Sequence, residues 1–343
     1  DLNLTGGLIM RMLSVVALIL CILLLAGCSA PAVPEETTAP TEPPTGPALS
    51  NPNATAEAEK LYGYLCSLSG TAVLSGQMES TWMGSPDYEM DYIFETTGKY
   101  PAIRGLDYMH DDFAGVNERA KKGWSEGRIP TIMWHTGCDF YGEWADALAD
   151  EIADWDATLT PGTPEYEAFI AGMDKAAEAL LELQEAGVPV IWRPFHEFDG
   201  RWFWWGKGGS ENFIKLWQLM YDRYTNHWGL NNLIWVLPYS GNGKAYGNWY
   251  PGDEYCDILG ADSYDGGVQN RLYTLLTMVS DDGKPYCFHE CGTNPTAEEL
   301  QTTPWVWFMT WHTDHITKNN APDDLKELYN SDYVITKDEL PLR

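Results

Sequence analysis

Basic residues are scarce in this chain of 343 residues. It has 21 lysines and arginines against 50 aspartates and glutamates, which gives a formal net charge of −29. So acidic a surface repels the phosphates of nucleic acids and the headgroups of anionic lipids, and neither is expected as a partner. A neutral polymer such as a polysaccharide would be indifferent to this charge.

Other familiar patterns are also missing. No glycine-rich phosphate-binding loop follows any expected strand, which argues against a nucleotide-binding fold. The segments Asp281–Gly283 and Asp323–Asp324 are typical of a turn and a helix start, not of a calcium loop. The cysteines show no disulfide framework, and Cys287 and Cys291 lie too far apart to pair if they share one strand. We expect mostly buried thiols, at least one of them unpaired, at Cys66, Cys138, Cys256, Cys287 and Cys291.

The N-terminal region has the pattern of an export signal. Arg11 precedes an apolar stretch from Met12 to Leu25, which is too short for a comfortable membrane span and suits the core of a signal peptide. The stretch runs into Leu25-Ala26-Gly27-Cys28, which resembles a bacterial lipobox. We therefore expect residues 1–27 to be a leader and lipoprotein signal peptide. Cys28 is the expected lipidation site, with a plain secretory signal or a buried helix as the alternatives.

The next segment has almost nothing to bury. From Ser29 to Pro47 it consists largely of proline, threonine, alanine and glutamate, a composition typical of an extended tether. We expect residues 28–50 to hold the lipidation site and tether, and residues 51–343 to form one folded domain. The expected location is the extracellular face of a bacterial cell membrane, or the medium if the protein is secreted.

Helix-like and strand-like segments alternate along the remaining residues. Thr163 is expected to cap a helix that has Pro164 at its first position and ends before Gly187. Ser210 is expected to cap the next helix, which Gly229 closes. Eight apolar runs bounded by turn residues are expected as strands: Thr71–Ser75, Ala102–Leu106, Pro130–Trp134, Val188–Arg193, Leu233–Leu237, Asp257–Ala261, Pro285–His289 and Trp305–Trp311. Eight alternating units predict an α/β fold, a single (β/α)8 TIM barrel, over an open doubly wound sheet.

A barrel places its chemistry at the carboxyl ends of its strands. Polar or aromatic side chains stand at each of these ends, which is the pattern of a functional site. They are Gln77, Asp107, His135, His196, Glu197, Tyr239, Asp262, Tyr264, Glu290, Trp311 and His312.

The segment Val190–Gly206 is the most informative part of the chain. A short apolar run leads to Glu197, and four consecutive aromatic residues follow at positions 202–205. Polysaccharide cleavage needs an acid to protonate a glycosidic oxygen, and it needs flat aromatic faces that stack on sugar rings. The alternative is an ion-paired glutamate beside a core aromatic cluster.

The run Arg-Pro-Phe-His-Glu, ending at Glu197, and the following Gly-x-Trp-Phe-Trp-Trp-Gly closely resemble the acid/base motif of the family 26 glycoside hydrolases. This group is best known for β-mannanases, and the resemblance extends from about Leu61 to about Pro341. It implies that Glu197 is the acid/base and that Glu290, in His289-Glu290-Cys291-Gly292, is the nucleophile. The alternative for Glu290 is a structural carboxylate near a glycine turn.

The same resemblance implies roles for further residues. His135 and His196 would hydrogen-bond the sugar or orient the glutamates, and Tyr264 would contact the nucleophile and lower its pKa. Trp311 would form the floor under the cleaved sugar. Of the four aromatics at 202–205 we expect two in the core and two facing sugar, with Trp202 the preferred platform. Supporting or groove-lining positions are expected at Arg193, Asp262, Asp107, His110 and Asp139–Tyr141.

Metal binding is the alternative for the histidines, because His110, Asp111 and Asp112 lie near His135 and His196 in the barrel order. No pair has the spacing of a known ligand motif, and glycoside hydrolysis needs no metal, so no metal or cofactor is expected. The resemblance implies a retaining endo-β-1,4-mannanase acting on mannan, galactomannan or glucomannan, as a monomer that touches the membrane only through its lipid anchor. The alternatives are the same chemistry on β-1,3-1,4-glucan or β-1,3-xylan, and a non-catalytic surface lipoprotein that binds glycans.

Overall fold

The computed structural model describes residues 46–244, 246–267, 269–280 and 282–342. The expected leader, the lipidation candidate Cys28 and the tether as far as residue 45 lie outside these residues. Within them, no helix combines the length and the apolar character that crossing a bilayer requires.

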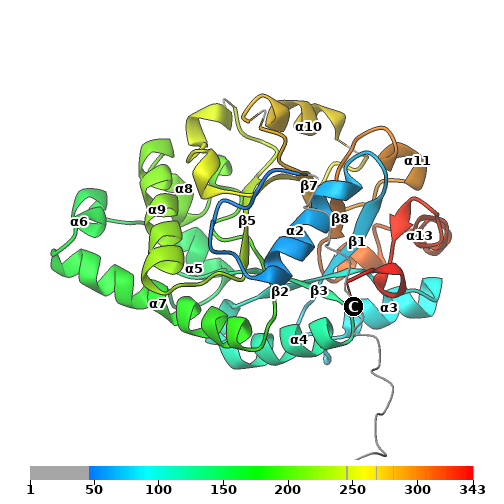
Figure 1. Ribbon diagram of the computed structural model, residues 1–343, viewed down its shortest axis with the longest axis horizontal. Coiled ribbons are helices and arrows are strands. Elements are labelled where there is room, and N and C mark those ends of the chain that lie inside the picture. The colour runs from blue at the N-terminus through cyan, green and yellow to red at the C-terminus, as the bar shows by residue number, and fades with distance from the viewer. Residues whose placement is uncertain (1–45, 245, 268, 281, 343) are drawn as a thin grey trace, which may run out of the picture. The chain divides into compact units, whose positions relative to one another are not determined.

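Eight parallel strands close into a barrel, which confirms the predicted (β/α)8 fold (Figure 1). Neighbours along the chain pair in order from β2 to β8. The ring closes because β1 pairs with β8 on one side, with Leu74 opposite Trp307, and with β2 on the other, with Gly76 opposite Ile103. The strands are β1 (Val73–Met78), β2 (Ile103–Asp107), β3 (Ile129–Met133), β4 (Val190–Trp192), β5 (Leu233–Tyr239), β6 (Ile258–Ser263), β7 (Tyr286–Cys291) and β8 (Trp307–Thr310).

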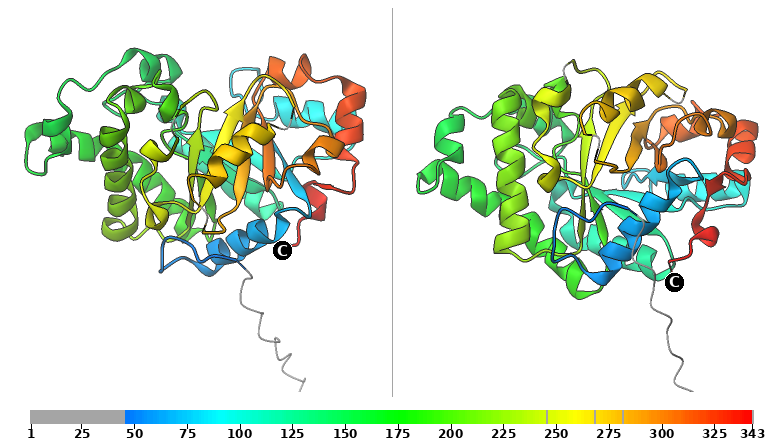
Figure 2. Two further views of the ribbon diagram at one scale, coloured as in Figure 1. Left: turned by 90° about the horizontal axis from the view of Figure 1, so that it is seen from above. Right: turned by 45° about the horizontal axis from the view of Figure 1, so that its top comes forward.

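Helices surround the strands on the outside, as the views of Figure 2 show. Several are short turns that lie in the loops leaving the strands. The helices are α2 (Ala56–Leu68), α3 (Tyr88–Thr97), α4 (Phe113–Ser125), α5 (Trp144–Ala149), α6 (Trp155–Leu159), α7 (Pro164–Glu185), α8 (Trp204–Lys207), α9 (Ser210–Asp222), α10 (Asn270–Thr277), α11 (Ala297–Leu300), α12 (Asp314–Thr317) and α13 (Pro322–Tyr329). Shorter helical turns are η1 (Met109–Asp111), η2 (Phe198–Gly200), η3 (Arg223–His227), η4 (Tyr246–Trp249), η5 (Asp253–Tyr255) and η6 (Lys337–Glu339).

The helix ends follow local chemistry. The hydroxyl of Thr163 accepts the backbone N–H of Tyr166 and caps α7, as predicted. The prediction that Ser210 caps α9 is wrong by one residue. Gly209 holds the cap position with φ of 83°, a conformation that favours glycine, and Ser210 is the first helical residue.

Two apolar layers form the core. The inner layer fills the barrel with residues such as Ile103, Ile191 and Met309, and side chains of α2 pack against it. The outer layer lies between strands and helices, where the buried face of α7 packs together with Trp192 and Trp235. Because the barrel interior is filled by side chains, a functional site is expected at the carboxyl ends of the strands.

Smaller features lie outside the predicted pattern. A ninth strand, β9 (Val334–Ile335), pairs in parallel with β1 on the outside of the barrel. Two residues are too few to give a periodic signal in the sequence. At the other end of the folded region, Leu49 packs against the inner layer, and the backbone N–H of Ser50 donates to Asp257 at 2.6 Å.

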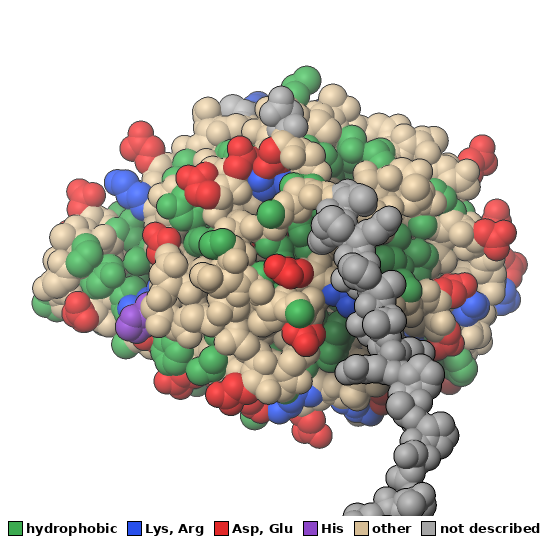
Figure 3. All heavy atoms as spheres, viewed as in Figure 1, with side chains coloured by type: hydrophobic (Ala, Val, Ile, Leu, Met, Phe, Trp, Pro, Cys, Tyr) green, Lys and Arg blue, Asp and Glu red, His purple; other side chains and the backbone are tan. Residues whose placement is uncertain are grey.

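The cysteines of the described region are all unpaired thiols. Cys256, Cys287 and Cys291 are buried, as predicted, whereas Cys66 and Cys138 are partly exposed. Acidic side chains are scattered over the face seen in Figure 3, with fewer basic ones between them. Charge alone therefore gives no sign of an anionic partner on this face.

Candidate active site

Glu290 lies near the end of β7 and is almost completely buried. The guanidinium of Arg193 donates to its Oε1 at 3.0 Å, and the hydroxyl of Tyr264 donates to its Oε2 at 3.0 Å. Burial raises the pKa of Glu290, while Arg193 and Tyr264 act against that rise. The predicted contact between Tyr264 and Glu290 is present. This contact acts to lower the pKa of Glu290, as predicted, although burial has the larger effect and leaves the pKa raised.

Glu197 sits in a sharp turn five residues beyond the end of β4, not directly at the strand end. Its φ is 54°, a left-handed conformation that a side chain rarely adopts outside functional turns. The turn is tied down because the backbone N–H of Glu197 donates to the carbonyl of Pro238 at 2.8 Å. Trp202 donates its indole N–H to Oε2 of Glu197 at 3.0 Å.

The two glutamates differ in what surrounds them. Burial, followed by the negative charge of Glu290, raises the pKa of Glu197 to about 8. Glu197 accepts from a neutral indole and lies beside the carboxyl group of Asp262, whereas Glu290 accepts from a cation and a phenol. The pair therefore holds its proton on Glu197 and its negative charge on Glu290. One protonated and one ionised carboxyl group is the requirement for glycoside hydrolysis.

Most of the aromatic run at 202–205 belongs to the core. Phe203, Trp204 and Trp205 are buried and Trp202 is partly exposed, so the expectation of two core and two sugar-facing residues is wrong. The indole of Trp204 donates to the carbonyl of Thr136 and that of Trp205 to the carbonyl of His196, both at 2.8 Å. Buried indoles need such partners, and here they fix the turn that carries Glu197.

Two histidines expected in the site lie close together, and one of them, His135, lines the cleft described below. The ring of His135 meets that of His196 edge-on, with centroids 4.6 Å apart. Asp107 accepts from the backbone N–H of His135 at 3.0 Å and lies 2.6 Å from its Nδ1. Burial alone would raise the pKa of Asp107, but its contact with His135 outweighs burial and lowers it. Trp311 lies 6.3 Å from His135 between ring centroids, and its carbonyl accepts from Gln77 at 3.1 Å.

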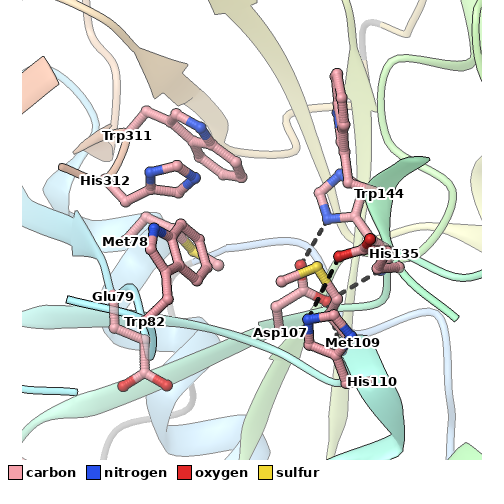
Figure 4. A pocket seen from close by; sticks show the side chains of 11 residues that line it. Met78, Glu79, Trp82, Asp107, Met109, His110, His135, Trp144, Trp311 and His312 are labelled. Carbon is pink, nitrogen blue, oxygen red and sulfur yellow. Dashed lines mark hydrogen bonds and ion pairs between the residues drawn. The ribbon is translucent and has the colours of Figure 1, made fainter. Parts of the chain in front are cut away.

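A cleft of about 530 Å³ opens beside these residues (Figure 4). Its two walls carry Trp82 and Trp144, whose side chains are about half exposed. The side chains that line the cleft are Met78, Glu79, Trp82, Asp107, Met109, His110, His135, Glu143, Trp144, Trp311 and His312. Trp82 and Trp144 were not predicted. The available signal was a tryptophan within, or directly after, a polar and glycine-containing segment that follows a strand end, where binding residues are common.

Several predicted positions take no part in the cleft. Tyr239 is buried within the end of β5, where its hydroxyl donates to the carbonyl of Tyr246. Phe140 is a core residue, while Asp139 and Tyr141 lie beside it outside the cleft lining. His110 does line the cleft, and its Nε2 lies 3.5 Å from Glu143.

One cluster has the donor types of a metal site. Ligand atoms of Asp262, His289 and Glu290 lie within 4.8 Å of one another. The Nη1 group of Arg193 lies among them, 2.9 Å from Nε2 of His289 and 3.0 Å from Oε1 of Glu290. The guanidinium supplies the positive charge that a metal ion would otherwise bring to these donors, so the residues do not fit an ion.

The sequence of residues 50–339 matches the profile of glycosyl hydrolase family 26. A mannan endo-1,4-beta-mannosidase of Thermothelomyces thermophilus is 36% identical over 317 residues, which cover 85% of this chain and 63% of that protein. The chain spans less than two thirds of the length of this and of two further curated relatives.

Solved structures agree with this match. A family 26 protein of Muricauda sp. MAR_2010_75 superimposes with a TM-score of 0.79 and 38% identity, covering 84% of this chain and 99% of that one. A beta-mannanase from a symbiotic protist of the termite Reticulitermes speratus, complexed with gluco-manno-oligosaccharide, superimposes with a TM-score of 0.80 and 29% identity. The match covers 86% of this chain and 98% of that one. This chain belongs to glycosyl hydrolase family 26.

Proposed function

We propose that this protein is a retaining endo-β-1,4-mannanase. The observation that carries the proposal is the contrast between the two glutamates at the barrel mouth. Arg193 and Tyr264 favour the ionised form of Glu290, whereas burial and the charge of Glu290 favour the protonated form of Glu197. This division of roles supports a double displacement.

In the first step an oxygen of Glu290 attacks the anomeric carbon and forms a glycosyl ester. Glu197 gives its proton to the departing glycosidic oxygen, and the C–O bond breaks. Glu197, now ionised, takes a proton from a water molecule that attacks the same carbon and releases the carboxylate of Glu290. Two successive inversions retain the β configuration.

The choice of sugar rests on the relatives. Several are named mannan endo-1,4-beta-mannosidases, and one structural neighbour is a beta-mannanase in complex with gluco-manno-oligosaccharide. The cleft with aromatic walls suits a neutral sugar polymer, and the relatives named mannan endo-1,4-beta-mannosidases favour endo action.

We also propose that the protein is exported and anchored to the bacterial surface through a lipid on Cys28. The support is the lipobox-like Leu25-Ala26-Gly27-Cys28 after an apolar stretch, followed by a segment rich in proline and threonine. A tether of this kind would hold the barrel away from the membrane and within reach of polymeric substrate.

The test is the release of reducing ends from a panel of polysaccharides by purified wild-type protein and Glu290→Gln. We expect turnover of mannan, galactomannan and glucomannan by wild type and none by the variant. Preferred turnover of β-1,3-1,4-glucan or β-1,3-xylan would reassign the substrate. Binding to mannan without turnover would support the alternative of a glycan-binding lipoprotein and contradict the proposal.

A further inference from the structure

A β-bulge lies in β7 directly before the nucleophile. Ala261 of β6 pairs with Phe288, but the next residue of β6, Asp262, pairs with Glu290, so His289 is left without an opposing residue. Side chains alternate between faces in a regular strand, and an extra residue interrupts this alternation. Here both His289 and Glu290 reach the same partner, Arg193, which two neighbours in a regular strand would not do.

The bulge completes a line of buried contacts that ends on Glu290. Oδ1 of Asp262 lies 2.6 Å from Nδ1 of His289, and Nε2 of His289 lies 2.9 Å from Nη1 of Arg193. The same Nη1 group donates to Oε1 of Glu290 at 3.0 Å. All four side chains are buried, so water does not replace any of these contacts.

The contacts determine the protonation of His289. A guanidinium has no acceptor, so Nε2 of His289 must accept from Arg193. The proton of the neutral imidazole then lies on Nδ1 and is donated to Asp262. Burial, and next the charge of Arg193, hold the pKa of His289 well below its usual range, so the ring stays neutral. The ionisable groups that face this ring are Asp262, Arg193, Glu290 and His196, whose ring centroid lies 6.3 Å from that of His289.

Arg193 has few other contacts that fix its orientation. Its Nε has no hydrogen-bond partner within the described residues, and its Nη2 meets only the sulfur of Met78, at 3.2 Å. A thioether is a weak acceptor. Of the groups that hold the guanidinium, His289 is therefore the one that fixes its plane independently of Glu290.

We propose that His289 is a positioning residue for the nucleophile. It holds one N–H of Arg193, so that the other N–H points at Oε1 of Glu290 and keeps this carboxylate ionised and aimed at the anomeric carbon. Asp262 fixes the tautomer that makes this possible. The inference rests on the proposed function, since it assigns a role within the same site.

Two substitutions that introduce an amide at position 289 test the two contacts of the histidine ring separately. The amide oxygen of Gln at position 289 reaches the place of Nε2 and can accept from Arg193. The shorter Asn reaches only the place of Nδ1 and can contact Asp262. The variants His289→Gln and His289→Asn therefore form a matched pair that differs by one methylene group. Cys287→Ala, one layer deeper in the same strand, is the control for a general loss of packing.

The measurement is the pH profile of kcat/KM on an aryl β-glycoside whose leaving group needs no proton, made from the sugar that wild type cleaves. We expect His289→Gln to keep the acidic limb of the wild type. His289→Asn should lose about 10- to 100-fold in kcat, the scale of one hydrogen bond to a charged group, with little change in KM. Its acidic limb should move to higher pH, because Glu290 without a fixed Arg193 is harder to ionise.

Three results are distinguishable. Equal acidic limbs in the Gln and Asn variants would overturn the inference and leave His289 a packing residue. A wild type without glycosidase activity would overturn the proposed function instead. A nitrogen NMR spectrum of the wild type tests the inference without any variant: we expect the Nδ1–H tautomer with no titration between about pH 5 and 8. An Nε2–H tautomer, which cannot accept from Arg193, would overturn it.

Discussion

Trp202 donates its indole N–H to Oε2 of Glu197 across 3.0 Å. The contact joins the carboxyl group that gives up a proton to the one member of the aromatic run that is not buried. A sugar that stacks on this indole would lie against the acid/base. The hydrogen bond also favours the ionised form of Glu197, against burial and the charge of Glu290, which raise its pKa to about 8.

The pH profile should therefore have its basic limb near the pKa of Glu197. Raising the pH above about 8 removes the proton that the leaving group needs, so kcat/KM on polysaccharide should fall. Trp202→Phe keeps an aromatic ring but loses the N–H donor, so the pKa of Glu197 should rise and the basic limb should move to higher pH. Initial rates across a pH series decide this, and a limb that moves to lower pH would refute the assignment.

The two glutamates should respond differently to removal. Glu290→Ala should abolish turnover of every substrate, since no other group can form the ester. Glu197→Ala should lose on the order of 10²–10⁴-fold on polysaccharide. With an activated aryl glycoside it should still form the ester but hydrolyse it slowly. Added azide, which needs no general base, should restore turnover to the Glu197 variant alone. Equal inactivity of both variants, with no azide rescue, would remove the assignment of roles.

The exposed tryptophans of the cleft should contribute to the binding of polysaccharide. Trp144 lines the cleft with its side chain about half exposed, and Tyr141 on the same loop is more exposed but lies outside the lining. Trp144→Ala should raise KM on mannan by roughly two- to ten-fold with little change in kcat, the scale of one lost aromatic contact. Tyr141→Ala is the matched control. A Trp144 variant with unchanged KM, or equal effects of the two changes, would show that this wall does not hold sugar.

Local signals in the sequence predicted the barrel well. The strands were found because short apolar runs end at turn residues, and α7 because Thr163 and Pro164 mark a helix start. The positions of Glu197, Glu290, Tyr264 and their neighbours then followed from the rule that a barrel carries its site at the strand ends, together with the family motif.

The predictions failed, or were not made, at positions whose side-chain orientation depends on tertiary packing. The sequence of an aromatic run is the same whether its rings face sugar or the core. The orientation of Trp204 and Trp205 depends on the backbone carbonyls that accept their indole N–H groups, and these come together only in the fold. The bulge at His289 depends on the register between β6 and β7, which no local pattern encodes. Trp82 stands in a polar loop and Trp144 at the first position of the short helix α5, and only the folded barrel brings them to the walls of one cleft.

Removal of the proposed lipid site should separate location from activity. Cys28→Ala should release the protein from the membrane fraction of a bacterial host, because the remaining apolar segment is only a signal core. Activity on mannan should not change, since none of the residues placed in the site lies before the tether. Detergent partitioning and an activity assay on both fractions measure the two effects. A variant that stays membrane-bound would show that Cys28 does not anchor the protein.

The most direct test of the account is to trap the glycosyl ester. In a 2-deoxy-2-fluoro glycoside of the cleaved sugar the fluorine slows both steps. A good leaving group speeds the first step alone, so the glycosyl ester accumulates. Mass spectrometry of the intact protein should show one added glycosyl group, and fragmentation of its peptides should place that group on Glu290. An adduct on another residue, or products released with inverted configuration and no adduct, would contradict the mechanism.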